Sequence, residues 1–503
     1  MKKFCLLLAL LLLLTGCSKH PNQSQPSQTP TDTSEQIDPG QQQAALPVTF
    51  DIFVINDLHG KLADTAAQPG VDELSTYLKQ AQRSSNTILL STGDMWQGTS
   101  ESNLTGGFII TEWMNRLGFA AMTLGGHEFD WGEDGIRQNT ALAEFPFLGI
   151  NIYSRQTGQQ ADYCQSSLVV DVDGAKIGII GAIGDCYGSI ASENTKDVYF
   201  ITGPALTDLV KAESEKLRSQ GADCIIYAIH DGYDQNSSGS SAMAVADPQL
   251  AGYYDTILSQ GYVDLVFEAD THFTYVLEDS RGVYHLQAGG NNNGISHASV
   301  LIDKQNNSSW VFTAELLAAS RYGYLEDDPV VAELLEKYAE QIAPATGVLG
   351  TNSQYRSGNH ICQLVADLYC SAGIEKWGAD YDIVLAGGYI SCRSPGYLPA
   401  GEVTYSQLQS LLPFDNRITL CSIRGRDLID KFLETDNQAY FIKTTPYGES
   451  IRGNIDPDGV YYVVADSYTA DYIYNHMTVI ATYDAGIYAR DLLADYVSAG
   501  GMD

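Results

Sequence analysis

Apolar runs of four to seven residues recur along the first part of the chain, separated by polar loops and amphipathic stretches. Runs of this length that are rich in β-branched and aliphatic residues predict β-strands. A loop carrying Asp or His follows each of five such runs, which are Thr49–Ile55, Thr87–Ser91, Ala121–Leu124, Cys224–Ala228 and Val263–Phe267. Helical spacing predicts helices at Val71–Arg83 and Ile110–Leu117. This alternation predicts an α/β fold with polar residues at the carboxyl ends of its strands.

A further helix is predicted at Asp327–Ile342, where acidic residues and a proline precede an apolar stripe. Early acidic residues and an early proline are typical of a helix start. Ala343-Pro344 predicts the end of this single helix, which we expect to separate two domains. Strands are predicted again beyond it, at Tyr381–Leu385 and Val460–Ala465, so the second domain is also expected to be α/β.

The first 47 residues are predicted to lie outside the folded domains. Phe4–Leu14 is apolar and follows two lysines, but its 11 residues are too few to span a bilayer. Leu14-Thr15-Gly16-Cys17 resembles a bacterial lipobox, which is cut before a cysteine that then carries lipid. Residues 1–17 are therefore read as a lipoprotein signal peptide with lipidated Cys17, the alternative being an ordinary secretory signal. Residues 18–47 predict a disordered tether, because 19 of the 30 are Gln, Pro, Ser or Thr.

Composition and charge exclude several kinds of partner. The chain has 503 residues, 44% of them hydrophobic and 18% charged, which is typical of a globular protein. Its 28 Lys and Arg against 62 Asp and Glu give a formal charge of −34. Such a charge repels nucleic-acid polymers and anionic lipid headgroups, so we expect no binding to either of them. A lipid anchor would then be the sole membrane attachment. A small anionic substrate requires local cations.

Cysteine spacing argues against a local zinc–thiolate cluster. Beyond Cys5 and Cys17 the chain has seven cysteines and no CxxC pair. Since seven is odd, any set of disulfides among them leaves at least one free thiol.

Four of the nine histidines fall in or next to the predicted strand-end loops, at positions 59, 127, 230 and 272. Asp57 and His59 are two residues apart, so an extended strand end can direct both at one ion, and Asp94 follows the next strand. Carboxylate oxygens and imidazoles suit zinc, manganese or a similar divalent ion. Any one of these histidines alone could be an ordinary surface or core residue. Together they predict a metal centre.

The ordered blocks resemble those of the calcineurin-like metallophosphoesterases: Asp57-x-His59, Gly93-Asp94, Gly126-His127-Glu128-Phe129-Asp130, His230 and Thr271-His272. Within them the chain resembles the 5′-nucleotidase / UDP-sugar hydrolase family. Gly387-Gly388-Tyr389-Ile390 is similar to that family's substrate loop, and Leu412-Pro413-Phe414-Asp415-Asn416 to its Pro-Phe-x-Asn block. The resemblance implies a four-layer α/β/β/α metallophosphoesterase sandwich at 48–326, a linker helix at 327–346, and an α/β 5′-nucleotidase C-terminal domain at 347–503.

The resemblance also implies two divalent metal ions and a role for each block. One metal would be held by Asp57, His59, Asp94 and His272, with Asp94 bridging. The second would be held by Asp94, His230 and the positions of Gly126 and Asp270. His127 would stabilise the transition state, oriented by Asp130.

Two residues depart from the family pattern, which has Asn in place of Gly126 and His in place of Asp270. Glycine offers no side-chain ligand, so the second ion is expected to bind more loosely than the first. The carboxylate of Asp270 is a harder ligand, which would shift the preference toward manganese, magnesium or calcium.

The C-terminal residues predict nucleotide recognition. By resemblance, Phe414 and Tyr468 would sandwich a nucleobase, and Asn416 would contact the nucleoside. Phe414 could also be a plain core residue. The remaining substrate candidates are two glycines of the predicted loop, Gly387 and Gly388, and two arginines near the family's anion-binding positions, Arg356 and Arg393. Either arginine could instead be an ordinary solvated surface residue.

The sequence therefore predicts a monomeric, lipid-anchored, extracytoplasmic phosphohydrolase that removes phosphate from nucleotides with two divalent metals. One alternative is a non-catalytic nucleotide-binding surface lipoprotein. Another is a 2′,3′-cyclic phosphodiesterase/3′-nucleotidase of the same superfamily, against which Asp130 argues mildly, since that branch often has Asn there.

Overall fold

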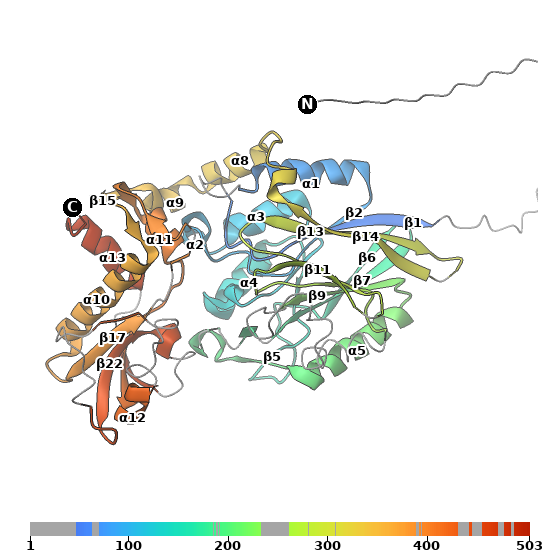
Figure 1. Ribbon diagram of the computed structural model, residues 1–503. Coiled ribbons are helices and arrows are strands. Elements are labelled where there is room, and N and C mark those ends of the chain that lie inside the picture. Colours follow the sequence, from blue (N-terminus) through green and yellow to red (C-terminus); the bar gives the residue numbers. More distant parts are fainter. Residues whose placement is uncertain are drawn as a thin grey trace, which may run out of the picture. The chain divides into compact units, whose positions relative to one another are not determined.

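Figure 1 shows the computed structural model of the protein. It describes residues 47–502 except 63–69, 185, 188–189, 191, 233–260, 280, 307, 389–391, 394, 431–441, 445–454, 471–476 and 484–486. The predicted signal peptide, Cys17 and nearly all of the predicted tether lie outside the described residues. No helix among the described residues is long and apolar enough to cross a membrane.

Residues 48–318 form two six-stranded sheets. The first has the order β14-β13-β1-β2-β3-β4, with β1 to β4 parallel and β13 and β14 antiparallel. Its strands are β1 (Val48–Ile55), β2 (Thr87–Ser91), β3 (Ala121–Thr123), β4 (Phe147–Leu148), β13 (Gly294–Asp303) and β14 (Ser308–Ala318).

The second sheet has the order β11-β12-β10-β9-β7-β6, and β7, β9, β10 and β12 are parallel. Its strands are β6 (Ser167–Val172), β7 (Ala175–Ile183), β9 (Cys224–His230), β10 (Leu265–Phe267), β11 (Thr274–Glu278) and β12 (Tyr284–Ala288). A separate pair is formed by β5 (Ile152–Ser154) and β8 (Val198–Phe200). All five strands predicted from the apolar runs are present, within two residues at each end.

The two sheets pack face to face. Apolar side chains from both, among them Ile52 and Leu90 of the first and Ile179 and Ile226 of the second, form one buried cluster. Helices cover the outer faces, and Figure 1 shows α1 and α5 on opposite sides of the sheets. They are α1 (Asp72–Ser84), α2 (Ser100–Leu104), α3 (Phe108–Leu117), α4 (Gly132–Leu142), α5 (Gly203–Ser219) and the 3₁₀ turns η1 (His127–Phe129), η3 (Ser192–Thr195) and η5 (Ala319–Arg321). The predicted α/β/β/α sandwich is confirmed.

The predicted single helix at Asp327–Ile342 is wrong. Two helices occupy this region, α8 (Pro329–Lys337) and α9 (Ala339–Thr346). They are separated at Tyr338, which leaves helical geometry (φ −96°, ψ 8°), packs into the core under α3 and shares a hydrogen bond with Glu112 of that helix. The second helix continues through Pro344, so the proline does not end it.

Beyond α9, a five-stranded sheet with the order β21-β17-β22-β20-β23 forms the second α/β part, coloured orange to red in Figure 1. Two apolar clusters pack against this sheet. Its strands are β17 (Ile383–Gly388), β20 (Ile418–Arg424), β21 (Ile442–Thr444), β22 (Val460–Asp466) and β23 (Met477–Thr482). The other elements are β15 (Val348–Asn352), β16 (Arg356–Ser357), β18 (Tyr397–Leu398), β19 (Gly401–Thr404), α10 (Gly358–Trp377), α11 (Tyr405–Leu411), α12 (Gly425–Leu428) and α13 (Ala489–Ser498). The exact domain boundaries at 326 and 347 stay a prediction.

Candidate metal centre and substrate pocket

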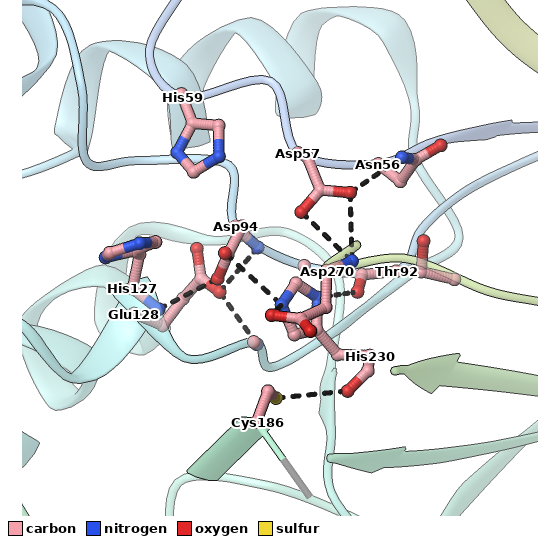
Figure 2. A network of polar contacts seen from close by, with 12 residues as sticks. Asn56, Asp57, His59, Thr92, Asp94, His127, Glu128, Cys186, His230 and Asp270 are labelled. Atoms are coloured by element: carbon pink, nitrogen blue, oxygen red, sulfur yellow. Dashed lines mark hydrogen bonds and ion pairs between the residues drawn. The ribbon is translucent and has the colours of Figure 1, made fainter. Parts of the chain in front are cut away.

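The predicted metal ligands meet at the carboxyl ends of strands from both sheets. Asp57 follows β1 and Asp94 follows β2, while His230 is the last residue of β9 and Asp270 follows β10. Parallel strands end at a common edge, so these loops converge. Figure 2 shows their side chains directed toward one another.

Five of the six predicted ligands have a left-handed backbone. Asp57, His59, Asp94, Asp270 and His272 have φ between 49° and 68°. This conformation is costly for residues other than glycine, roughly 1–3 kcal/mol each, and it persists where the surrounding structure enforces it. Such strain concentrates at functional sites. It is the strongest backbone signal for a site in the described residues.

Four sets of three ligand groups among the described residues are close enough to hold an ion. One joins His127 to His59 and Asp94, one contains Cys186, and two consist only of predicted ligands. Asp57, His59 and His272 form one set, and Asp57, Asp94 and His230 the other, with the ligand atoms within 4.8 Å of one another in each set. The Nε2 atoms of His59 and His272 are 3.1 Å apart, and His272 Nε2 is 3.5 Å from Asp57 Oδ1. Two imidazole nitrogens at this distance are typical of ligands that share one cation or proton.

The histidine rings are oriented by backbone carbonyls. His59 Nδ1 lies 3.0 Å from the carbonyl of Gln97, and His230 Nδ1 lies 2.6 Å from that of Thr92. An Nδ1–H that donates to a carbonyl leaves Nε2 available as a metal ligand.

His230 supplies the test of whether the residues fit a cation. Its side chain is fully buried, and its Nε2 has no hydrogen-bond partner although it lies 3.2 Å from Asp94 Oδ2. A buried polar atom is rarely left without a partner, and a metal ion satisfies both groups. The residues therefore fit a divalent cation.

Glu128 holds the loops that carry these ligands. Its fully buried carboxylate accepts hydrogen bonds from the backbone N–H groups of Asp94, Met95 and Gly125, at 2.8–2.9 Å. Burial and the neighbouring Asp94 raise the pKa of Glu128 to about 7. Gly93 is required here as well, since a Cβ at this position would lie 2.6 Å from the backbone nitrogen of Gly125.

The two departures from the family pattern have different surroundings. Gly126 has a helical backbone (φ −66°), and a Cβ there would meet only Ile190, at 3.8 Å, so glycine is not required at this position. The carboxylate of Asp270 lies 4.0 Å from His230 Nε2, on the side where Cys186 also approaches. Burial and nearby carboxylates, Asp270 first among them, hold the pKa of the Cys186 thiol well above its usual value.

His127 lies beside the centre and is paired with Asp130. The Nδ1 of His127 is 2.9 Å from Asp130 Oδ2, and its backbone N–H donates to Asp94 Oδ1 at 2.8 Å. Burial lowers the pKa of His127, but the carboxylates of Asp130 and Asp94 outweigh that effect and raise it to about 9. A protonated imidazole at the rim of the centre can stabilise developing negative charge.

A pocket beside the metal ligands joins the two halves of the chain. The ring of Phe414 stacks on His127, and the guanidinium of Arg393 lies 5.0 Å from the centre of that ring. The side-chain amide of Gln97 donates to the carbonyl of Pro413. The lining residues are His59, Lys61, Gln97, Gly98, Thr99, His272, Asn291, Arg393, Ser410, Pro413 and Phe414.

Other predicted substrate residues lie elsewhere. Arg356 is in β16, where its Nε donates to Asn352, and it is not among the described residues that line the pocket. Asn416 and Tyr468 do not line the pocket either. Asn416 donates to Asp466, which ends β22 two residues before Tyr468.

Asp466 connects three of the predicted substrate elements. Besides accepting from Asn416, it accepts two hydrogen bonds from Thr469, one from the backbone N–H and one from the hydroxyl. Its Oδ2 would lie 2.3 Å from a Cβ at Gly388, so only glycine fits at that end of β17. Gly387 precedes it in the same buried strand.

Sequence reasoning missed four residues of this region. Glu128 lay within a quoted block, and the odd cysteine count was the one signal for a thiol such as Cys186. Asp466 and Arg490 carried no local signal. Arg490 is buried, forms an ion pair with Asp415 and donates to the carbonyls of Pro413 and Phe414, so it holds the substrate block in place.

Comparison with solved structures identifies proteins that share this fold. A putative 5′-nucleotidase from Staphylococcus aureus superposes with a TM-score of 0.71 at 16% identity, covering 90% of this chain and 97% of that one. A 5′-nucleotidase precursor from Thermus thermophilus gives 0.66 at 18% identity, covering 90% and 96%. These likenesses show the fold, that of the 5′-nucleotidases with an N-terminal phosphoesterase domain.

Sequence comparisons find similarity to the same group of proteins. Residues 341–457 match the family model described as 5′-nucleotidase, C-terminal domain. The chain is 27% identical over 420 residues to Protein UshA of Yersinia enterocolitica, covering 76% of this chain and 73% of that protein. It is 25% identical over 495 residues to a 5′-nucleotidase of Diplobatis ommata, covering 91% and 83%. The predicted resemblance to the 5′-nucleotidase family, and with it the predicted class of hydrolase, is confirmed.

Proposed function

We propose that this protein removes phosphate from nucleotides in a reaction that requires divalent metal ions. The observation that carries the proposal is the convergence of Asp57, His59, Asp94, His230 and His272 on adjoining ion-sized sites, beside a histidine paired with a carboxylate. The likeness to 5′-nucleotidases supports the same reaction class.

The residues fit two divalent cations. Asp57, His59 and His272 would hold the first, and Asp94 and His230 would hold the second, with Asp94 between the two. Bound there, such ions supply Lewis-acid polarisation of a phosphoryl group and lower the pKa of water. The carbonyls of Gln97 and Thr92 keep the imidazoles of His59 and His230 in the ligating orientation.

His127 is proposed to act on the reacting phosphoryl group. Asp130 fixes its ring and favours its protonated form, so Nε2 would donate a proton in a hydrogen bond to a phosphoryl oxygen as negative charge develops. Arg393 lines the same pocket and supplies a second positive charge for an anionic substrate.

The base is proposed to stack on Phe414, with Tyr468 as the second ring. The pocket holds only about 60 Å³, well below the roughly 300–1,000 Å³ of ligand pockets. We therefore propose that Phe414 separates from His127 when a nucleotide binds.

The protein is proposed to act outside the cytoplasm as a monomer, anchored through lipid on Cys17. The lipobox-like Leu14-Thr15-Gly16-Cys17 and the polar segment that follows support this location.

Phosphate release from a panel of nucleoside monophosphates, cyclic nucleotides and sugar nucleotides tests the function. The chain is stripped with a chelator and reloaded with one defined metal at a time. Release of phosphate from 5′-nucleotides that requires added metal is expected. Preference for 2′,3′-cyclic substrates would favour the phosphodiesterase alternative. Binding of nucleotides without release from any of them would favour the non-catalytic one.

A further inference from the structure

Cys186 lies next to the second proposed metal position. Its sulfur, an imidazole nitrogen of His230 and a carboxylate oxygen of Asp270 all lie within 4.8 Å of one another. The cysteine comes from the segment after β7, and Figure 2 places its side chain below those of His230 and Asp270. The thiol donates to the backbone carbonyl of His230 at 3.2 Å.

His230 gives an independent sign that a ligand belongs at this point. Its Nε2 is fully buried, has no hydrogen-bond partner and is directed between Asp94, at 3.2 Å, and Asp270, at 4.0 Å. Gly126, whose position the family resemblance assigns to this ion, brings no side-chain donor. The second ion thus lacks a ligand at the position of Gly126, and the thiol of Cys186 lies nearby.

We propose that Cys186 is a ligand of the second metal ion, where it replaces the donor that Gly126 does not supply. The complete set would be Asp94, His230, Asp270 and Cys186. The proposal rests on the metal-dependent function proposed above. Ligands of a tetrahedral zinc ion lie about 3.3–3.6 Å apart. The distances of 3.2 and 4.0 Å from His230 Nε2 to the two carboxylates are close to this range. The Cys186 sulfur, which lies within 4.8 Å of His230 and Asp270, has to approach Asp94 as the ion binds.

The hydrogen bonds around the thiol allow it to become a ligand. Coordination breaks the S–H bond, forms a sulfur–metal bond and releases the proton to solvent, with no change of oxidation state. The carbonyl of His230 loses the thiol donor but keeps the backbone N–H of Gly184, which donates to it at 2.9 Å. The carbonyl oxygen of His230 therefore keeps a hydrogen-bond partner.

A thiolate changes which ion the second site prefers. Sulfur ligands favour zinc and other borderline or soft cations over manganese, magnesium and calcium. Asp270 considered alone predicts the opposite preference. The sequence also gave no reason to expect a thiolate site, because Cys186 and His230 are brought together by the neighbouring strands β7 and β9.

Cobalt and cadmium binding to the full chain test the proposal without measuring activity. Thiolate ligation of Co²⁺ or Cd²⁺ gives a charge-transfer band in the ultraviolet. We expect this band in the wild type at two ions per chain, and its loss in Cys186→Ser and Cys186→Ala. The second ion should bind at least ~10-fold more weakly in both variants, since even residues that only support a ligand cost 10- to 100-fold.

Two controls make the result specific. Cys164→Ser removes another buried thiol of the same half, whose sulfur contacts the carbonyls of Gly149 and Ala161, and it should keep the band. Cys186→Ser combined with Gly126→Asn should bind the second ion again but without the band. Circular dichroism and retention of the first ion establish that each variant is folded.

The proposal is overturned if the wild type binds two ions with no thiolate band, if the band survives in Cys186→Ser, or if the wild type binds fewer than two ions. Phosphate release is scored separately. A thiolate band in a protein that hydrolyses no nucleotide would refute the proposed function and leave this site in place. Two bound ions and nucleotidase activity without a thiolate band would refute ligation by Cys186 and leave the proposed function in place.

Discussion

The imidazole of His127 is stacked on the phenyl ring of Phe414, with ring centroids 5.3 Å apart and planes 18° apart. The first residue follows β3 beside the metal ligands, and the second belongs to the block proposed to bind the base. Gln97 connects the same two regions, since its carbonyl orients His59 and its side-chain amide donates to Pro413. The proposed chemical and recognition groups are therefore in direct contact.

Replacing His127 should impair turnover without removing metal. Its Nδ1 is engaged by Asp130, and it supplies a positive charge rather than a place in the ligand set proposed here. His127→Ala is expected to lower kcat by roughly 10²–10⁴-fold while metal content, measured by elemental analysis, stays at the wild-type level. His297→Ala, on β13 and paired with Asp51 and Glu315, is the matched control. Parallel loss of metal and activity would instead make His127 a ligand.

Truncating the proposed stacking rings should weaken nucleotide binding selectively. A lost base stack costs roughly 1–3 kcal/mol, or about 5- to 150-fold in affinity. Phe414→Ala and Tyr468→Ala are each expected to show this loss by calorimetry, with little change in hydrolysis of a small chromogenic phosphate ester. Phe312→Ala, an aromatic on β14 that is 55% exposed, should change neither. Equal losses on both substrates would indicate that the rings serve only packing.

Introducing the family residues should strengthen the second metal site once the thiol of Cys186 is removed. Gly126→Asn is tolerated by the backbone, because the helical φ of −66° suits any residue and a Cβ would meet only Ile190. In the Cys186→Ser background, which lacks the proposed thiolate ligand, Gly126→Asn with Asp270→His is expected to tighten binding of the second ion and raise turnover at low metal, measured by metal titration. Gly126→Ala adds a side chain without a donor and should do neither. In the wild-type background the same double variant is expected to bind the second ion no tighter, because ligation by Cys186 already completes the site. Failure to tighten binding in the Cys186→Ser background would contradict the prediction.

Removing the proposed lipidation site should release the protein from membranes. Two acyl chains stabilise membrane attachment by roughly 0.8 kcal/mol per buried CH₂, whereas the −34 charge of the chain opposes it. Cys17→Ala should move the protein to the soluble fraction after cell fractionation, and Cys5→Ala, within the same leader, should leave it in the membrane fraction. Membrane retention of Cys17→Ala would refute the lipobox.

Cys362 and Cys392 should form a disulfide under oxidising conditions. Their sulfur atoms lie 3.7 Å apart, and the second cysteine precedes Arg393 of the pocket. Oxidised glutathione should remove one hydrogen from each thiol, forming one disulfide and two molecules of reduced glutathione. The closed loop predicts a stability gain of roughly 3–4 kcal/mol, measured by denaturant unfolding, with the link identified by mass spectrometry. Cys362→Ser should show no gain, and two thiols that stay reduced in the wild type would refute the prediction.

The sequence by itself determined the fold class and most of the candidate centre. Short apolar runs followed by Asp or His predict strands with polar carboxyl ends, because the periodicity of a strand is local information. The spacing of Asp57 and His59 placed them in one loop, but the predicted extended strand end is wrong, because β1 ends at Ile55 and both residues have left-handed backbones. His230 and His272 were recognisable from the sequence because each lies shortly after an apolar run that predicts a strand.

Only the tertiary structure decided the contacts between distant segments. Cys186 reaches His230 because β7 and β9 are neighbours in the sheet, and Arg490 reaches Asp415 because α13 packs beside α11. Tyr338, at which α8 ends, likewise donates a hydrogen bond to Glu112, a residue of another helix. Such contacts are selected by the packing of whole elements, where burial and pairing energies outweigh local propensity, so no pattern within one segment encodes them.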